Sequence, residues 1–197
     1  MTTSLTTGLI TVVLAAGSGK RFGSLKQLAT IDGLPMVRRS VMAAGAAMGD
    51  ALVLVAGPDA STVHEAAGAD FLIVNEQHAD GIGSSIAIAA RTLRPVAKAL
   101  MFCLADQPGI PPDHYRAVAD AWDGSEDAVI ATAFDDSSGP PVLFGRGHFD
   151  RLAALTGDQG AKALLKESGD SLVTIRCDSA ALDIDRPGDL ERLDQVP

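Results

Sequence analysis

The sequence predicts an α/β protein with three layers, in which a mostly parallel, twisted sheet lies between helices on both faces. Short apolar segments such as 9–14, 51–56 and 99–104 alternate with amphipathic segments, which is the pattern of βαβ units. Hydrophobic residues make up 47% of the chain but aromatic residues only 4%. This composition favours aliphatic packing of helices on a buried parallel sheet.

The length of 197 residues fits one domain. We expect residues 1–8 to form a disordered N-terminus and residues 9–197 to form a single domain, because the first residues are polar and uncharged. No apolar stretch follows a basic patch at this end, and no apolar run approaches the length of a membrane span. We therefore expect a cytoplasmic protein.

The first half of the chain alternates expected strands and helices. Pro35 near the start and Gly49 after the end delimit the first helix, because proline suits the first helical turn and glycine ends helices. In order, we expect a strand at 9–14, an extended piece at 27–31, a turn at 32–33, a helix at 34–48, strands at 51–56 and 71–74 separated by a short helix, a helix at 82–93 and a strand at 99–104.

The second half continues the pattern with shorter elements. The polar residues 134–141 predict a turn between two strands, and Pro187 and Asp189 predict the start of a terminal helix. In order, we expect a helix at 113–122, strands at 128–133 and 142–144, helices at 149–155 and 163–167, and a strand at 172–177.

The charge balance limits the partners. A net charge of −9 argues against binding of nucleic acid or an anionic membrane. It does not argue against a single nucleotide, and paired carboxylates can hold Mg²⁺. Cys103 and Cys177 lie in apolar runs without metal-binding spacing, so both are expected to be buried small hydrophobic residues.

A glycine-rich, cationic segment follows the first strand directly. Gly17, Gly19 and Gly23 permit positive φ angles and leave no Cβ in the way, so backbone N–H groups can converge on one anion. The densest positive charge of this acidic chain lies in the same segment, at Lys20, Arg21 and Lys26. The combination predicts a phosphate-binding loop. A strand-to-helix connection whose cations face water is the alternative.

Two general nucleotide-binding motifs do not fit this segment. The P-loop requires Gly-Lys-Ser or Gly-Lys-Thr, which occurs nowhere in the chain. In the dinucleotide fingerprint the third glycine comes one position earlier than Gly23, and an acidic residue follows the second strand, where this chain has Gly57. These mismatches count against an NAD(P)-dependent oxidoreductase.

The segment after strand 71–74 places Asn75 and three small residues, Gly81, Ser84 and Ser85, around the start of the next helix. Serine hydroxyls donate and accept hydrogen bonds, and the first N–H groups of a helix lack partners. The segment therefore suits recognition of a nucleotide base or ribose. Simple helix capping accounts for the same residues equally well.

Asp106 follows the strand 99–104, where the ligand crevice of a parallel sheet is expected. Mg²⁺ prefers one or two carboxylates together with phosphate oxygens and water. Asp106 is therefore the first candidate metal ligand, although aspartate before Pro108 also suits a turn. Asp185 is the candidate for a second ligand and Asp183 is its alternative, because residues two apart in an extended segment point the same way.

Taken together, these segments resemble one family, the MobA-like NTP transferases, and within it the molybdopterin cytidylyltransferase branch. Three residues depart from the family pattern: Phe22 stands where methionine is usual, Arg186 where threonine is typical, and Pro140 where histidine is often found. The resemblance rests on six motifs in order over nearly the whole chain, at 14–26, 75 with 81–85, 104–108, 139–144, 157–162 and 183–190.

The resemblance implies a Rossmann-like nucleotidyltransferase fold and transfer of CMP or GMP to the phosphate of molybdopterin, with release of pyrophosphate. CTP is favoured over GTP because the chain reads Leu-Ala-Ala-Gly at 14–17, whereas the guanylyl branch typically reads Leu-Ala-Gly-Gly. The resemblance implies that the glycine loop binds the NTP phosphates and that Asp106 binds Mg²⁺. With the residue-based arguments above, the candidate nucleotide-binding residues are Leu14, Ala15, Ala16, Gly17, Ser18, Gly19, Arg21, Lys26, Asn75, Gly81, Ser84 and Ser85; the candidate catalytic residues are Arg21, Lys26 and Asp106; the candidate Mg²⁺ ligands are Asp106 and Asp185.

Three other functions remain open at this point. A sugar-phosphate or other small-phosphate nucleotidyltransferase would use the same phosphate loop. A non-catalytic, nucleotide-binding maturation factor would have the apoprotein of a molybdenum enzyme as its partner. The NAD(P)-dependent oxidoreductase is the third, and the motif mismatches above count against it.

Overall fold

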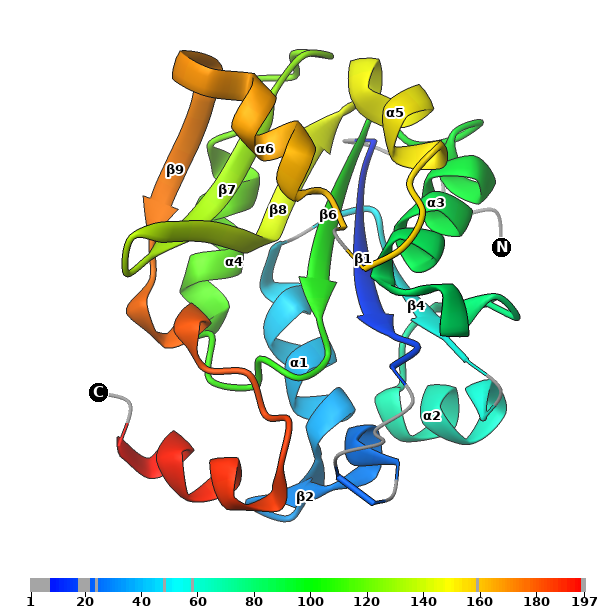
Figure 1. The fold of residues 1–197 in the computed structure, drawn as a ribbon, viewed down its shortest axis with the longest axis vertical. Helices are drawn as coiled ribbons and strands as arrows, with labels where there is room; N and C mark the ends of the chain where they lie inside the picture. The colour runs from blue at the N-terminus through cyan, green and yellow to red at the C-terminus, as the bar shows by residue number, and fades with distance from the viewer. Residues whose placement is uncertain are drawn as a thin grey trace.

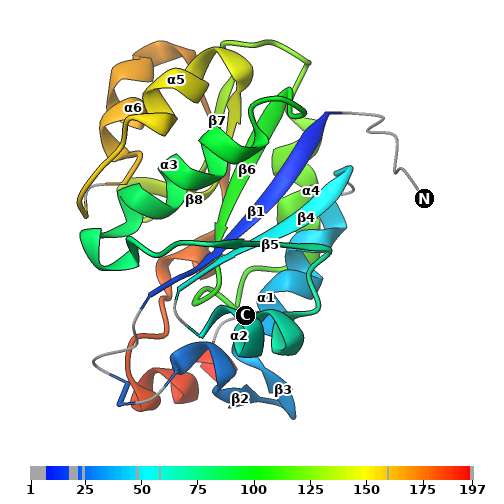
Figure 2. The same ribbon diagram turned by 90° about the vertical axis from the view of Figure 1, so that its right-hand side faces the viewer.

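The computed structural model describes residues 8–17, 22–23, 25–47, 49–57, 59–158 and 160–195. Within these residues, seven strands form one sheet in the order β5-β4-β1-β6-β8-β7-β9, with helices on both faces (Figures 1 and 2). The strands are β1 (Leu9–Ala15), β4 (Ala51–Ala56), β5 (Phe71–Val74), β6 (Ala99–Leu104), β7 (Val129–Phe134), β8 (Ser137–Gly145) and β9 (Leu172–Arg176).

The sheet is mostly parallel, as the sequence predicts. Strand β1 pairs in parallel with both β4 and β6, β4 pairs in parallel with β5, and β7 pairs in parallel with β9. Strand β8 is antiparallel to its neighbours β6 and β7. The carboxyl ends of β1, β4 and β6 therefore meet at one edge of the sheet, where the ligand crevice of such a fold is expected.

The two faces of the sheet carry separate hydrophobic cores. Successive residues of β1 alternate between them, because side chains along a strand point to opposite faces: Val13 packs in one core and Val12 in the other. The first core includes side chains of α1 (Met36–Ala44), α2 (Ala60–Ala67) and α4 (Pro112–Asp120), and the second includes side chains of α3 (Ile82–Leu93), α5 (Phe149–Ala153) and α6 (Lys162–Ser168).

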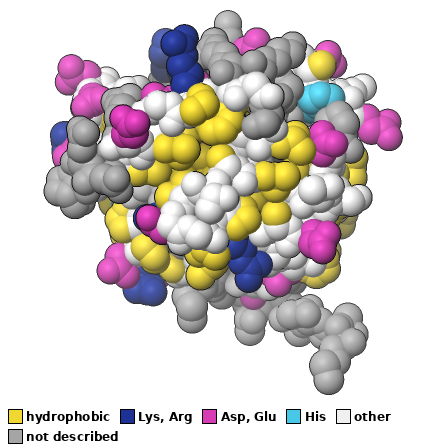
Figure 3. Space-filling model, turned by 90° about the horizontal axis from the view of Figure 1, so that it is seen from below, with side chains coloured by type: hydrophobic (Ala, Val, Ile, Leu, Met, Phe, Trp, Pro, Cys, Tyr) yellow, Lys and Arg dark blue, Asp and Glu magenta, His cyan; other side chains and the backbone are white. Residues whose placement is uncertain are grey.

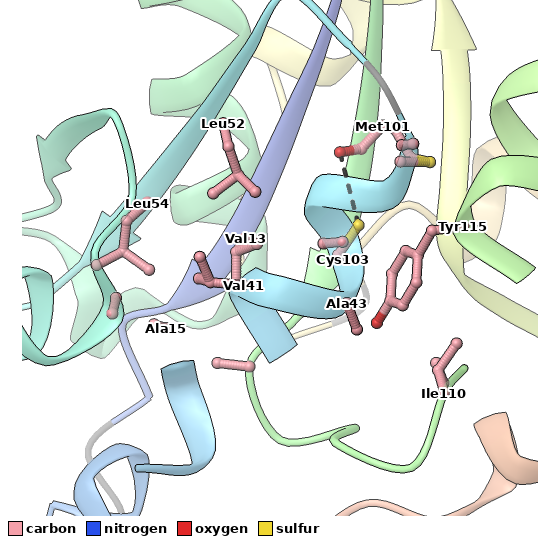
Figure 4. Close-up of a cluster of buried hydrophobic side chains, with 14 of the residues drawn as sticks. Val13, Ala15, Val41, Ala43, Leu52, Leu54, Met101, Cys103, Ile110 and Tyr115 are labelled. Atoms are coloured by element: carbon pink, nitrogen blue, oxygen red, sulfur yellow. Dashed lines mark hydrogen bonds between the residues drawn. The ribbon is translucent and has the colours of Figure 1, made fainter. Parts of the chain in front are cut away.

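Figure 4 shows part of the first core, in which Val41 of α1 lies near Val13 of β1 and Tyr115 of α4 lies on the side of Cys103 of β6. Cys103 is buried and free, and Cys177 is half-buried and free. The expected burial is thus complete for Cys103 and partial for Cys177. Within the described part of the chain, no helix has the length and apolar character needed to cross a bilayer.

A hairpin replaces the expected start of the first long helix. Strand β2 (Thr30–Ile31) pairs with β3 (Leu34–Pro35) around Asp32 and Gly33, whose φ angles are 48° and 82°. Two residues with positive φ form the tight turn that suits a two-residue hairpin. The prediction of a helix from residue 34 is therefore wrong, and α1 begins at Met36.

A second hairpin occupies the expected polar turn at 134–141. Strands β7 and β8 reverse at Asp135 and Asp136, where Asp135 has a φ of 47°. Strand β8 thus begins at Ser137 and not at residue 142. The register shifts between Ala131 and Thr132. This extension of β8 was not predicted from the sequence, because Gly139, Pro140 and Pro141 are unfavourable in regular strands.

Several connections are short 3₁₀ helices, and the expected terminal helix is one of them. Residues 27–28, expected to be extended, also lie in a 3₁₀ turn. At the start of the chain, the carbonyl of Gly8, which was expected to be disordered, accepts hydrogen bonds from the backbone N–H groups of Lys98 and Ala99. Residues 1–7 lie outside the described set. The 3₁₀ helices are η1 (Lys26–Leu28), η2 (Gly45–Ala47), η3 (His78–Asp80), η4 (Arg146–His148), η5 (Gly169–Ser171), η6 (Asp178–Ala181) and η7 (Pro187–Gln195).

A buried histidine ties α4 to the β7–β8 pair. The Nε2 atom of His114 lies 2.8 Å from the hydroxyl oxygen of Thr132, and that hydroxyl donates to the carbonyl of Pro141 at 3.0 Å. Because the hydroxyl hydrogen is already used, Nε2 must carry a proton and act as the donor. Burial lowers the pKa of His114 below its ordinary value of 6.5.

This depressed pKa predicts a pH-dependent stability. The unfolded chain binds the histidine proton at a higher pH than the folded chain does, so stability is full above pH 6.5 and falls as the pH drops through the folded pKa. We expect the difference in unfolding free energy between wild type and His114→Gln to shrink as the pH is lowered from about 7.5 to about 5. Urea titrations at several pH values measure it. A pH-independent difference would contradict the assignment.

Candidate active site

A hollow of about 440 Å³ lies at the carboxyl ends of β1 and β6. Figure 3 looks onto this end of the molecule, where hydrophobic side chains gather near the middle of the face and charged ones lie around it. Predicted site residues that line the hollow are Leu14, Ala15, Ala16, Gly17, Lys26, Gly81, Ser85 and Asp106. The structure therefore brings three separate sequence motifs to one place.

Lys26 links two carboxylates that are far apart in the sequence. Its Nζ atom lies 2.7 Å from Oδ2 of Asp106 and 2.9 Å from Oδ1 of Asp185. It also lies 3.4 Å from the carbonyl oxygen of Ile184. The side chain of Lys26 is only 12% exposed, so these are partly buried, charge-assisted contacts, which are stronger than those at the open surface.

The two carboxylates control the ionisation of this lysine. Burial of the ammonium group by itself lowers the pKa of Lys26, because it disfavours the charged form. The charges and hydrogen bonds of Asp106 and Asp185 outweigh that effect, and the resulting pKa lies above the ordinary value of 10.5. Lys26 is therefore a permanent cation at neutral pH.

Backbone pairing brings Asp185 to the site. The N–H of Ile184 donates to the carbonyl of Asp106 at 2.9 Å, which aligns residues 182–185 with the end of β6. The carboxylate of Asp189 accepts from the N–H groups of Asp185 and Arg186 at 3.0 and 2.8 Å. Asp189 thereby fixes the turn at which Asp185 sits, a local interaction typical of aspartate.

Asp183 lies near the same cluster but in a different environment. Desolvation of its carboxyl group and repulsion from Asp106 raise the pKa of Asp183, while a hydrogen bond with Gln107 opposes this rise. Among the contacts of the described residues, Lys26 pairs with Asp185 and not with Asp183. The structure thus gives the two aspartates different contacts, and the assignment of Asp185 as a metal ligand stays a prediction.

Gln27 is a site residue that the sequence did not single out. Its side chain is 3% exposed, and its amide nitrogen donates to the carbonyls of Ala15 and Gly17 at 2.8 and 2.6 Å. It thereby fixes the backbone where β1 leads into the glycine-rich segment. The signal available in the sequence was a polar residue directly after Lys26, followed by apolar positions.

We expect Gln27→Met to lower the free energy of unfolding by about 2 kcal/mol, because it leaves two carbonyl groups without their donor. The exposed Gln77→Met is the matched control, since the Gln77 side chain makes no hydrogen bond in the described structure. Its effect should stay within about 0.5 kcal/mol. Urea denaturation of both variants checks the prediction, and equal stabilities would contradict it.

Asn75 and Ser84 are buried and do not line the hollow. The Asn75 amide nitrogen donates to the hydroxyl oxygens of Ser84 and Ser85 at 2.8 and 2.9 Å, and its oxygen accepts from the N–H of Gln77 at 3.0 Å. These contacts hold the loop before α3 in place. Of the three predicted polar residues, Ser85 lines the hollow. Nucleotide contacts of Asn75 and Ser84 stay predictions.

The loop at 156–158 covers the start of α3. The N–H of Gly83 donates to the carbonyl of Gly157 at 2.9 Å. A Cβ on Gly81 would lie 2.3 Å from Oδ1 of Asp158, and one on Gly83 would lie 2.7 Å from the carbonyl carbon of Thr156. Glycine at both positions therefore permits the loop to lie directly on the helix.

A second hollow of about 340 Å³ adjoins the first and shares Leu14, Ile82 and Leu104 with it. Asp158 lines both. The second hollow lies beside β8 and is largely apolar, with polar groups at a few points; its lining includes Phe102, Gln107, Phe134, Ser138, Pro140, Phe144, Lys162 and Asp183. Two adjoining hollows can hold two reactants next to each other.

The oxygen atoms around Lys26 fit a hard divalent cation. Carboxylate oxygens of Asp106 and Asp185 already converge on one positively charged atom. Among the described residues, no group of three or more histidine, cysteine or acidic side chains is arranged as a metal site. Two carboxylates without further protein ligands suit Mg²⁺, which keeps several waters and takes phosphate oxygens as ligands.

Part of the predicted phosphate loop lies outside the described residues. This applies to Ser18, Gly19 and Arg21, which the sequence assigned to nucleotide binding, and to Lys20. Their contacts therefore stay predictions. The described ends of the loop, Gly17 and Lys26, both line the first hollow.

Comparison with known proteins gives consistent matches along the chain. The family model for the MobA-like NTP transferase domain matches residues 11–172. The purine catabolism protein PucB of Bacillus subtilis is 28% identical over 193 aligned residues, which cover 91% of this chain and 92% of that protein.

Solved structures agree with this match. Rv0371c of Mycobacterium tuberculosis is 30% identical, with a TM-score of 0.77 and coverage of 94% of this chain and 97% of that one. Its complex with manganese is 27% identical, with a TM-score of 0.74 and coverage of 94% and 96%. The molybdopterin-guanine dinucleotide biosynthesis protein A of Archaeoglobus fulgidus, at 16% identity, a TM-score of 0.68 and coverage of 95% and 97%, shares the fold.

Proposed function

Because the chain belongs to the family of MobA-like NTP transferase domains, we propose that it transfers CMP from CTP to the phosphate of molybdopterin and releases pyrophosphate. The observation that carries the proposal is the cluster of Lys26, Asp106 and Asp185 at the edge of the first hollow. It places one permanent cation and two potential metal ligands beside residues Leu14–Gly17, at the end of β1. Nucleotidyl transfer needs such a site, because a triphosphate must be held and its charge neutralised.

The choice of CTP rests on Ala16. This residue lines the first hollow and is 8% exposed. Its methyl group occupies space that a glycine at the same position would leave open, and the guanylyl branch that the sequence resembles has glycine there. A smaller hollow favours a pyrimidine over a purine.

The second hollow is the proposed acceptor site. Its apolar lining, with Phe102 and Phe144, suits the flat ring system of a pterin, and Lys162 offers a positive charge for a phosphate. It adjoins the first hollow at Asp158, so an acceptor phosphate bound there would lie next to the nucleotide. The proposal therefore uses both hollows.

In the proposed reaction, the residues of this chain position the reactants and balance charge. Mg²⁺ bound by Asp106 and Asp185 would supply positive charge at the triphosphate. Lys26 contributes a permanent cation for the β- and γ-phosphates, together with Arg21 as the sequence predicts. Gln27 holds the backbone at Ala15 and Gly17 in the geometry that meets the phosphates. The acceptor phosphate is already ionised, so its attack on the α-phosphate requires no general base.

Pyrophosphate release with ATP, CTP, GTP and UTP, each with Mg²⁺ and with or without molybdopterin, tests the proposal. We expect release with CTP that depends on molybdopterin. Ala16→Gly is the matched variant, and it should shift the preference from CTP toward GTP while leaving the acceptor requirement unchanged.

The other outcomes point to different functions. Release with a sugar phosphate and not with molybdopterin would indicate a sugar-phosphate nucleotidyltransferase. Nucleotide binding without release under any condition would favour a maturation factor that contacts the apoprotein of a molybdenum enzyme. A fluorescence change on titration with NADH or NADPH, together with no release, would favour an oxidoreductase. Each of these results would contradict the proposed reaction.

The proposal includes a cytoplasmic location. Cys103 and Cys177 are both free, as is usual in reducing compartments, where disulfides are rare. Fractionation of cells that express a tagged chain would test it.

A further inference from the structure

The ammonium group of Lys26 occupies the point on which two potential metal ligands converge. Asp106 follows β6, and Asp185 precedes η7, so they come from separate parts of the fold. Their nearest oxygens lie 2.7 and 2.9 Å from the same Nζ atom. The side chains of Lys26 and Asp106 are 12% and 22% exposed, and that of Asp185 is 48% exposed.

A divalent cation between these carboxylates would stand very close to the Lys26 charge. Carboxylate oxygens bind Mg²⁺ at about 2.0–2.1 Å. The metal ion and the Lys26 ammonium would therefore contact the same carboxylate oxygens and lie close to each other. Repulsion between positive charges at such a distance is large where solvent is partly excluded. The two carboxylates therefore cannot hold the lysine contacts and a metal ion in full at the same time.

We propose that Lys26 competes with the divalent cation for the carboxylates of Asp106 and Asp185. The lysine blocks the metal site until a triphosphate draws it away. The free protein then binds a divalent cation weakly, and metal and nucleotide bind with positive coupling. Such coupling is a free energy shared by the two ligands, so each strengthens the binding of the other. The triphosphate as the ligand that draws Lys26 away rests on the proposed function, whereas the competition itself does not.

The chain offers independent support for this competition. The described structure supplies no third acidic, histidine or cysteine ligand that would favour the metal over the lysine. The contacts of Lys26 Nζ with Asp106 and Asp185, at 2.7 and 2.9 Å, are also charge-assisted, so a metal ion must displace both of them to take these oxygens.

Mn²⁺ binding to the protein without nucleotide is the first test, with free Mn²⁺ measured by electron paramagnetic resonance. One charge-assisted hydrogen bond contributes about a factor of ten to an equilibrium, so we expect Lys26→Met to bind Mn²⁺ about tenfold more tightly than wild type. Lys26→Arg retains the cation and should stay close to wild type. Lys166→Met, at an exposed position of α6, removes the same charge elsewhere and should also leave the affinity unchanged.

Equal Mn²⁺ affinities of wild type and Lys26→Met would overturn the proposal. The double variant Lys26→Met with Asp106→Asn should lose the gain, which would locate the ion at this cluster. A gain that survives Asp106→Asn would also overturn the proposal, because it would place the ion elsewhere.

Amine labelling of the wild-type protein is a second test that needs no variant. Lys26 should react slowly with an acylating reagent in the free protein and faster with saturating Mn²⁺, with Lys166 as the internal reference in mass spectrometry. Unchanged labelling of Lys26 would contradict its displacement.

The two proposals fail in different ways. Pyrophosphate release from CTP and molybdopterin, with no effect of Lys26→Met on Mn²⁺ affinity, would refute the competition and leave the function standing. The reverse combination would refute the function and leave the competition standing.

Discussion

Asp106→Asn is expected to lower kcat/KM for pyrophosphate release about 10³-fold, the size of effect seen when one main charge-stabilising group of a phosphoryl-transfer site is lost. The substitution removes one of the two carboxylates that converge at the edge of the first hollow. It changes neither the size of the side chain nor the backbone contact between Asp106 and Ile184. The fold should therefore remain intact, and circular dichroism would confirm this.

Asp113→Asn is the matched control for this variant. Asp113 is an exposed carboxylate of α4 that pairs with Arg116, and its loss should leave turnover unchanged. Asp185→Asn should share much of the defect of Asp106→Asn, whereas Asp183→Asn should cause a smaller one, because Lys26 pairs with Asp185. Near-normal turnover of Asp106→Asn with Mg²⁺ and CTP would refute its assigned role.

The second large effect is expected at Gly83, in the first turn of α3. Alanine at a helical glycine normally raises stability, by up to about 1 kcal/mol. Here the added Cβ would lie 2.7 and 2.8 Å from the carbonyl carbon and oxygen of Thr156 and 2.9 Å from the carbonyl oxygen of Gly157. These are backbone atoms that cannot rotate away, so we expect Gly83→Ala to lower the free energy of unfolding by about 1–3 kcal/mol.

Gly83→Ala should also impair activity, because the displaced loop carries Asp158 between the two hollows. Gly45→Ala is the control, and it should raise the free energy of unfolding, whereas Gly83→Ala should lower it. A Cβ there would meet a single atom, Cδ1 of Leu52, at 3.8 Å, which is ordinary contact, and the φ of −59° suits alanine. Chemical denaturation of both variants gives the comparison. A stabilised Gly83→Ala would show that the loop does not pack on α3 as described.

The parallel half of the fold could be predicted because its strands are continuous apolar runs. Strands β1, β4, β5 and β6 lie within one residue of their expected bounds, since Thr11 is the one polar residue in these four apolar runs. The two hairpins could not be predicted in the same way. Strand β3 is two residues long, and β8 contains Gly139, Pro140 and Pro141, so tertiary pairing overrides local preference in both cases.

The candidate site was predictable wherever a motif follows a strand. Ala16 and Gly17 follow β1, Asp106 follows β6, and parallel pairing of these strands brings their ends together. The role of Gln27 was not predictable, because nothing in the sequence says that its amide reaches back to Ala15 and Gly17. The different contacts of Asp183 and Asp185 could not be predicted either, since both lie on an extended segment and the sequence does not say which of them pairs with Lys26.

The most direct measurement is anomalous diffraction from crystals grown with Mn²⁺ and CTP. We predict one strong peak at about 2.0–2.2 Å from carboxylate oxygens of Asp106 and Asp185, with the triphosphate against residues Leu14–Gly17 and the Lys26 ammonium moved onto phosphate. A triphosphate bound away from residues Leu14–Gly17, or a manganese peak remote from Asp106, would contradict this prediction.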